Sequence, residues 1–198
     1  MNALNRFTLH SLPVSRWRNG GGETREIISW PPRGDAALGG DFAWRASIAT
    51  IDQDGDFSAF PHIDRNITLL EGHGAVLHGV KGGTHSLTRP GEPFAFAGED
   101  PVRAILVDGS SRDFNIMTRR GAMRAEVTLS TKEILLPAKR SGVIYVMAGQ
   151  WRWAGDGAPL TVREGGWWQD LFAPLALSPL SPDATVLWAD IRTCRRGI

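Results

Sequence analysis

Glycine and proline interrupt this chain so often that long helices have little room, and this spacing most constrains the fold. The 198 residues include 23 glycines and 12 prolines, spread along the chain rather than gathered in one linker. Between them lie runs rich in β-branched and aromatic residues, at 27–30, 42–51, 66–70, 75–80, 102–107, 143–147, 151–153 and 185–191. Many short strands with regular turn signals predict an all-β sandwich or barrel. The best place for a helical turn is the short stretch 113–120.

A weak internal repeat indicates that one β unit occurs twice. Residues 69–74 resemble 146–151, residues 90–96 resemble 164–170, and the strong strands 102–107 and 185–191 close each copy. Gly72 and Gly149 lie 77 residues apart, and Gly91 and Gly165 lie 74 apart. This order is typical of cupin jelly rolls. It predicts two cupin-like β-barrels in one chain, a bicupin of double-stranded β-helices. The first covers 1–121 and the second 122–198, and N-terminal strands could cross to the second barrel. The alternative is a single irregular β-sandwich.

Composition excludes several classes of partner. The chain carries 22 Lys and Arg against 21 Asp and Glu, a net charge of +1, so we expect neither nucleic acid nor an anionic membrane as partner. The single cysteine, Cys194, excludes an internal disulfide framework and a multi-cysteine zinc site. No signal-peptide pattern or run of 18 apolar residues is present, so we expect a cytoplasmic protein.

The histidines lack the spacing of a metal-binding cupin. His73 and His78 lie five residues apart, which places them on opposite faces of a strand. The other three histidines are isolated, and no His-x-His pair occurs. The aspartates at 52, 54 and 56 resemble a calcium loop, but no bidentate acid follows at the required distance. We therefore expect no metal and no cofactor.

Four segments carry polar residues that a plain β core does not need. A glycine-rich loop at 17–26 allows positive φ angles and exposed N–H donors. In 42–49, Arg45 and Ser47 share one strand face, which is either exposed or lines a polar cavity. Arg65 precedes an apolar strand and could bind a carboxylate, or form a local ion pair with Asp64. In 113–121, Asp113 shares a face with the residue two positions later if the segment is extended.

Together these segments resemble the HutD/Ves family. The motifs, in order between about Leu12 and Gly121, are Trp-x-Asn-Gly-Gly-Gly-x-Thr-x-Glu-Ile, Phe-x-Trp-Arg-x-Ser-Ile-Ala, Asp-Gly-x-Phe-Ser-x-Phe-Pro-x-x-Asp-Arg and Asp-Phe-Asn-x-Met-x-Arg-Arg-Gly. The resemblance implies a bicupin without the usual metal ligands. It also implies a regulatory role in histidine utilisation, through binding of a small pathway acid such as urocanate or formylglutamate.

Carried onto this chain, the family motifs imply a set of ligand-binding residues. Arg65 would be the main anion clamp, and the N–H groups of the glycine loop a second anchor. One strand cannot aim both residues 44 and 45 at the ligand, and the sequence leaves open which faces inward. His62 stands where the family usually has glycine, so a positive φ there would strain it. The implied set is Asn19, Gly20, Gly21, Thr24, Trp44, Arg45, Ser47, Arg65, Asp113, Asn115 and Met117.

Two functions are consistent with these residues. The first, which we expect, is a non-catalytic carboxylate-binding protein, as a monomer or homodimer. The second is a metal-independent isomerase or hydrolase with Asp64 or Asp113 as general base. A protein-interaction module would be indicated if side chains filled the barrel mouths.

Overall fold

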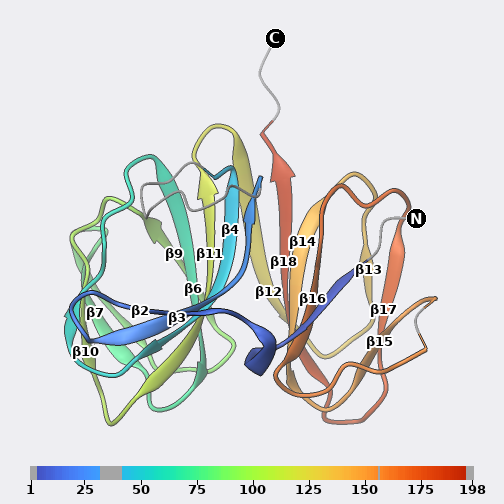
Figure 1. Ribbon diagram of the computed structural model, residues 1–198, viewed down its shortest axis with the longest axis horizontal. Helices are drawn as coiled ribbons and strands as arrows, with labels where there is room; N and C mark the ends of the chain where they lie inside the picture. Colours follow the sequence, from blue (N-terminus) through green and yellow to red (C-terminus); the bar gives the residue numbers. More distant parts are fainter. Residues whose placement is uncertain (1–3, 32–41, 156, 195–198) are drawn as a thin grey trace. The chain divides into compact units, whose positions relative to one another are not determined.

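The computed structural model describes residues 4–31, 42–155 and 157–194 and divides the chain into two compact units (Figure 1). The first unit comprises Pro13–Arg124 with Thr193–Ile198, and the second comprises Met1–Leu12 with Ala125–Arg192. Within the described residues, the sole helical element is one 3-10 turn, η1 (Leu9–Ser11), which Thr8 caps. The predicted all-β class is confirmed.

The first unit contains two antiparallel sheets. The six-stranded sheet has the order β2 (Val14–Arg16), β3 (Gly22–Trp30), β4 (Trp44–Ile51), β11 (Ser111–Arg119), β6 (Ile63–Glu71), β9 (Pro93–Ala97). The four-stranded sheet has the order β5 (Gly55–Asp56), β10 (Arg103–Leu106), β7 (Ala75–Val80), β8 (Gly83–Leu87). Apolar side chains from both sheets form one core cluster, because alternate residues of each strand face the opposite sheet.

The second unit repeats this plan with fewer strands. Its five-stranded sheet has the order β1 (Asn5–Thr8), β16 (Glu164–Trp168), β14 (Ser141–Ala148), β18 (Thr185–Thr193), β12 (Met123–Ser130). Its three-stranded sheet has the order β13 (Ile134–Leu136), β17 (Leu175–Pro179), β15 (Trp151–Trp153). The core between them is rich in tryptophan.

Strand order confirms the internal repeat and corrects its details. The order β4-β11-β6-β9 of the first unit matches β12-β18-β14-β16 of the second, and β5-β10-β7 matches β13-β17-β15. The counterpart of β18 is therefore β11, and the sequence match of 102–107 with 185–191 is wrong by one strand. All four sheets are open, so two closed barrels stay a prediction.

The helical turn considered at 113–120 is not formed. These residues belong to β11, which pairs with β4 on one side and β6 on the other. Hydrogen-bonded ladders on both edges and burial of both faces outweigh the weak local preference of a short polar–apolar stretch.

His62 has a φ of +63°, the left-handed conformation that strains a side chain. This confirms the expectation drawn from the glycine that the family usually has at this place. The residue lies in the turn that leads into β6, and its carbonyl oxygen accepts a hydrogen bond from the Arg120 N–H at 2.9 Å. That backbone bond holds the turn in place whatever side chain stands there.

We predict that His62→Gly raises the free energy of unfolding by about 0.5–1 kcal/mol, because relief of left-handed strain exceeds the extra entropy of glycine in the unfolded chain. Urea denaturation measures the change. The control is His78→Gly on β7, where glycine only weakens an exposed strand position and should lower stability. A loss of stability in His62→Gly would contradict this account of the turn.

Candidate functional site

Two buried charged side chains mark the site. Among the residues that the structure describes, Arg65 and Asp113 are the only buried charged ones, with 7% and 2% of their surface exposed. Arg65 lies on β6 and Asp113 on its neighbour β11. Because an unpaired buried charge costs several kcal/mol, two buried charged side chains on adjacent strands indicate a functional site.

Strand register builds the floor of this site from three neighbouring strands. Across β4, β11 and β6, Arg45, Met117 and Arg65 form one row. The next row on the same face is centred on Asn115, and the third on Asp113. The floor thus presents two polar side chains along β11, next to a row in which Met117 lies between two arginines.

Asn115 connects the two charged groups. Its side-chain amide donates a hydrogen bond to Asp113 Oδ1, and its Oδ1 accepts one from Arg65 Nη2 at 3.4 Å. In the part of the chain that the structure describes, Arg65 Nε and Asp113 Oδ2 have no hydrogen-bond partner. One donor and one acceptor are therefore left over in a buried place where polar atoms are normally paired.

Aromatic rings surround the Arg65 guanidinium. Its Cζ lies 4.9 Å from the ring centre of Phe96, 5.2 Å from that of Phe57 and 5.6 Å from that of Phe60. The electron-rich ring faces attract a cation. These rings stabilise the charge without using its N–H donors, so Nε–H keeps no partner among the described residues while Nη2 donates to Asn115.

Burial shifts the pKa of both charged groups. It lowers the pKa of Arg65 to about 10, against the opposing pull of Asp113. It raises the pKa of Asp113 to about 7, although the hydrogen bond from Asn115 and the charge of Arg65 both act in the other direction. At neutral pH Arg65 is therefore charged, and Asp113 is divided between its two protonation states.

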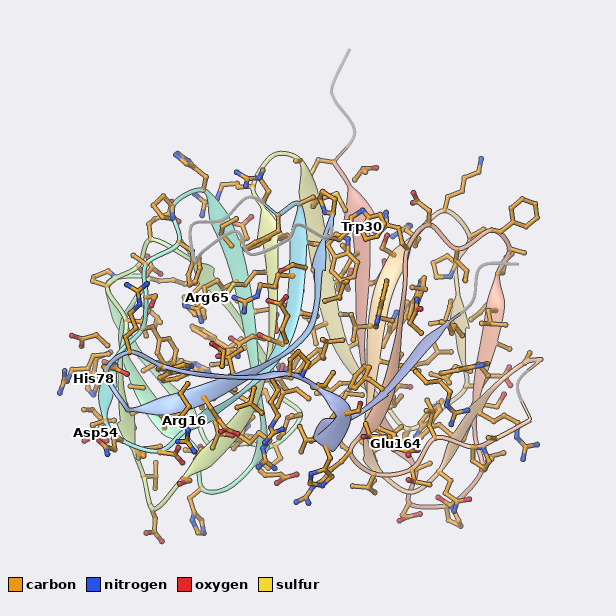
Figure 2. All side chains as sticks on the ribbon, viewed as in Figure 1. Arg16, Trp30, Asp54, Arg65, His78 and Glu164 are labelled. Atoms are coloured by element: carbon orange, nitrogen blue, oxygen red, sulfur yellow. The ribbon has the colours of Figure 1, made fainter. Side chains whose placement is uncertain are left out.

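A cavity of about 410 Å³ opens above this floor, within the first unit. Figure 2 shows Arg65 in the interior of the unit and Asp54 and His78 at its edge. The structure brings together eight of the eleven residues expected from the family motifs. They are Asn19, Thr24, Arg45, Ser47, Arg65, Asp113, Asn115 and Met117.

The other three expected residues do not line the cavity. Trp44 is fully buried on the opposite face of β4, which settles that Arg45 is the inward-facing member of that pair. The Gly20 N–H donates to the Trp17 carbonyl oxygen, and the Gly21 N–H donates to Asn19 Oδ1. The glycine loop thus closes on itself, and these two donors are not the second anchor that was expected.

Sequence reasoning missed part of the cavity lining. Several of its members stand inside the motifs already singled out, since the first motif contains a tryptophan and the third contains two phenylalanines. The signal was their closeness to Arg65 in the motif, because aromatic rings commonly surround a buried guanidinium. The missed residues are Ser15, Arg16, Trp17, Arg18, Ala49, Asp56, Phe57, Ser58 and Phe60.

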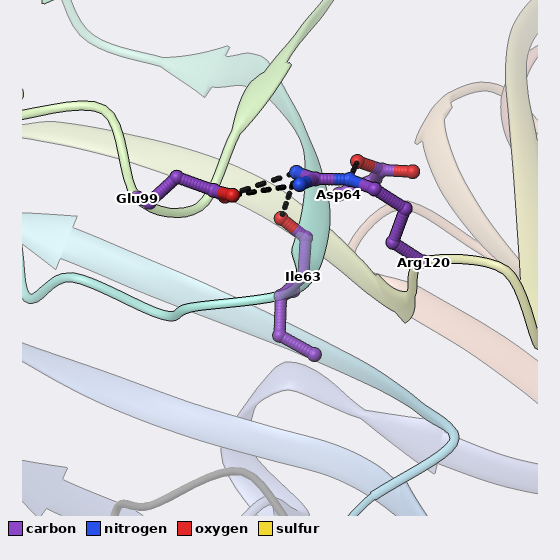
Figure 3. Close-up of polar contacts among 4 residues, drawn as sticks. All are labelled: Ile63, Asp64, Glu99 and Arg120. Atoms are coloured by element: carbon purple, nitrogen blue, oxygen red, sulfur yellow. Dashed lines mark hydrogen bonds and ion pairs between the residues drawn. The ribbon is translucent and has the colours of Figure 1, made fainter.

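Asp64 does not pair with Arg65, so the local ion pair considered for Arg65 is wrong. Alternation along β6 turns Asp64 outward, where its Oδ1 accepts a hydrogen bond from Arg120 Nε at 2.7 Å (Figure 3). Arg120 also binds Glu99 with both terminal nitrogens, at 2.6 and 2.9 Å. Asp64 is thus held outside the cavity, and Asp113 is the one candidate base that lines it.

The matching place in the second unit lacks an acid. In each unit one pair of the central ladder precedes a register irregularity: Leu69 with Asp113 in the first, Val146 with Val186 in the second. Val186 therefore stands where the first unit has Asp113, and it is fully buried in the tryptophan-rich core.

Arg65 has no counterpart there either. Arg65 lies four residues before Leu69 on β6, and Gly142 lies four residues before the matching Val146 on β14. A Cβ at Gly142 would lie 2.4 Å from Trp168 Cζ2, so the indole fills the space that a side chain would need. The second unit packs apolar rings where the first holds its polar floor.

Two further features bear on the expected partners. Among the described residues, no three His, Cys, Asp or Glu side chains lie close enough together to hold a metal ion. None of the described residues forms a helix with the length and hydropathy needed to cross a membrane.

Comparisons with known proteins identify relatives over nearly the whole chain. The HutD family profile matches residues 9–177. Protein Ves of Cronobacter sakazakii is 42% identical over 93% of this chain and 97% of its own. Protein Ves of Citrobacter koseri is 44% identical over 93% and 92%.

Solved structures agree with this relationship. HutD from Pseudomonas fluorescens SBW25, described in a formate condition, has a TM-score of 0.80 at 25% identity and covers 98% of this chain and 100% of its own. A conserved protein of unknown function from Pseudomonas aeruginosa PAO1 has a TM-score of 0.82 at 27% identity, over 96% and 98%. A cupin 2 conserved barrel protein from Leptotrichia buccalis shares the fold, with a TM-score of 0.61 at 12% identity over 97% and 98%.

The pKa of Asp113 predicts how stability depends on pH. In the unfolded chain an aspartate keeps its ordinary pKa of 3.8, whereas burial raises the folded-state pKa of Asp113 to about 7. Between these values the folded protein holds a proton that the unfolded chain has lost, so stability falls as pH rises. We expect wild type to lose up to about 1.4 kcal/mol per pH unit relative to Asp113→Asn between pH 5 and 7, and little more above that.

Urea denaturation of both proteins at pH 5, 6, 7 and 8 measures this difference. Asp64→Asn is the control, because Asp64 is exposed and outside the cavity, and it should follow wild type between pH 5 and 7. A constant difference between wild type and Asp113→Asn would contradict the raised pKa.

Proposed function

This chain belongs to the HutD family, and we propose that its first unit binds a small carboxylate, such as urocanate or formylglutamate, beside Arg65 without turning it over. The observation that carries the proposal is a buried guanidinium on a residue that lines the cavity, with an Nε–H that has no partner among the described residues. An arginine fork matches the two oxygens of a carboxylate, and such a contact contributes about 1.5–3 kcal/mol net.

The cavity also accommodates the body of a small acid. Its volume of about 410 Å³ falls in the range of ordinary small-molecule sites. Trp17 and Phe57 offer apolar surface opposite the polar floor and contact each other edge to face, with ring centres 6.5 Å apart. Arg16 and Arg18 add positive charge, which favours the approach of an anion.

The biological role follows from the family. We propose that the protein modulates histidine utilisation by sensing an acid of that pathway, in the cytoplasm and as a monomer or homodimer. We also propose that the two units are the two barrels of a bicupin. Their shared strand order and the fold likeness to the cupin 2 protein support this.

One observation favours a second candidate, an enzyme with Asp113 as general base. A carboxylate in a cavity with a pKa near 7 suits proton abstraction at neutral pH. Turnover of a bound acid would promote this candidate over simple binding.

We predict that at least one acid among formate, urocanate and N-formylglutamate raises the melting temperature of wild type. A ligand at 100 times its Kd stabilises the folded state by about 2.7 kcal/mol. In Arg65→Gln the Kd should rise about 10- to 100-fold, because the charged fork is lost. Thermal shift and titration calorimetry measure both effects, and proton NMR of the mixture detects turnover.

Arg112→Gln is the matched control. Arg112 lies on β11 beside Asp113, is ion-paired with Glu71 at 2.6 Å and does not line the cavity, so its loss should leave the Kd unchanged. Arg65→Lys keeps the charge without the fork and should bind with intermediate Kd. If no acid binds wild type, or if Arg65→Gln binds as wild type does, the proposal is wrong.

A further inference from the structure

We propose that Asp113 takes up a proton when a carboxylate binds beside Arg65, so that the affinity for the anion falls as pH rises. This inference rests on the proposed function, since it concerns how the same cavity accepts an anion. The protonation of Asp113 would then determine the net charge of the site that binds the ligand.

The surroundings of Asp113 leave one oxygen free for a proton. Oδ1 already accepts the hydrogen bond from the Asn115 amide, whose other end is held by Arg65. Oδ2 has no partner among the described residues, and Asp113 lines the cavity. A proton on Oδ1 would point at a donor, whereas a proton on Oδ2 would create a donor on the oxygen that has no partner among the described residues.

The charged groups around Asp113 show why a bound anion favours this proton. From β6, Arg65 acts on Asp113; from β4, Arg45 acts on Arg65 and is itself held by Glu26 at 2.7 Å. From β5, Asp56 lines the cavity but is paired with Arg103 at 3.0 Å. Arg16, on β2, and Arg18 also line the cavity.

The floor therefore balances one buried cation, Arg65, against one buried anion, Asp113. A carboxylate bound at Arg65 would be a second anion beside the one buried guanidinium among the described residues. In a poorly solvated site two adjacent carboxylates do not both stay ionised. Solvent supplies a proton to Asp113 Oδ2, and the neutral acid then donates a hydrogen bond to the ligand carboxylate. Because burial has already brought the pKa of Asp113 to about 7, this protonation costs little at neutral pH.

The test is the pH dependence of N-formylglutamate binding, measured by titration calorimetry from pH 6 to 9. Carboxyl groups of this kind stay ionised throughout that range. We expect a nearly constant Kd below the pKa of Asp113 and a roughly 50-fold rise between pH 7 and 9. About one proton should be taken up per ligand bound at pH 8. The apparent binding enthalpies in phosphate and in Tris should therefore differ by about the difference between the ionisation enthalpies of the two buffers.

Asp113→Asn should bind with a pH-independent Kd close to that of wild type at pH 6, because asparagine presents an N–H donor where the protonated acid presents its O–H. The control Asp64→Asn should keep the wild-type pH profile, since Asp64 lies outside the cavity and is paired with Arg120.

Each outcome decides between the two proposals. Binding with a constant Kd and a buffer-independent enthalpy would overturn proton uptake and leave the carboxylate site intact. A pH profile that persists in Asp113→Asn would overturn the assignment to Asp113. Failure of N-formylglutamate, formate and urocanate to bind at any pH would overturn both.

Discussion

Burial of the Arg65 guanidinium is the interaction on which the site depends. Removing a cation from water costs several kcal/mol, and the apolar side chains of an ordinary β core do not offset this desolvation cost. Here three phenylalanine rings, the Asn115 amide and the nearby Asp113 offset the cost together. None of them occupies Nε, so the arrangement holds the charge in place and leaves part of its binding capacity for a ligand.

The position of Arg65 follows from strand alternation, and so does that of its neighbour. On β6 the outward residue Asp64 forms an ion pair with Arg120, and the inward residue Arg65 lines the cavity. Arg120 in turn binds Glu99, so the carboxylate next to Arg65 in sequence is committed to the surface. A one-residue slip of β6 would exchange these two roles, which makes the register of this strand a condition for the site.

The two units share a strand order, but only the first has the polar residues of the cavity floor. The central ladders have the same strand order, but Gly142 and Val186 stand where the first unit has Arg65 and Asp113. Trp168 packs over Gly142 and closes the space. One copy of the repeat therefore keeps a polar cavity, and the other has a dry core of tryptophan and aliphatic residues.

Much of this could be predicted from the sequence, because periodicity and turn residues act locally. The eight predicted strand runs, the repeat, the shared face of Asp113 and Asn115 and the strained His62 all follow from spacing or from the family motifs. The inward face of β4 did not follow, since either Trp44 or Arg45 can be buried and only the partner strands decide between them.

The remaining errors have the same cause. The closing strand was mismatched because the short polar–apolar stretch of β11 has only a weak local preference, and sheet order alone identifies β11 as the counterpart of β18. The remaining residues of the cavity lining were missed because most of them, at 15–18 and 56–60, lie far from β11 in sequence. Long-range pairing, rather than local preference, determines these features.

The side-chain Nε–H resonance of Arg65 gives the most direct test of the central claim. It can be assigned in ¹⁵N-labelled protein by its loss in Arg65→Gln, and a pKa of about 10 keeps the group charged at neutral pH. On titration with N-formylglutamate the account predicts that this resonance shifts and saturates, because the unpartnered Nε–H meets a carboxylate oxygen. A resonance that stays in place while the ligand binds would contradict it.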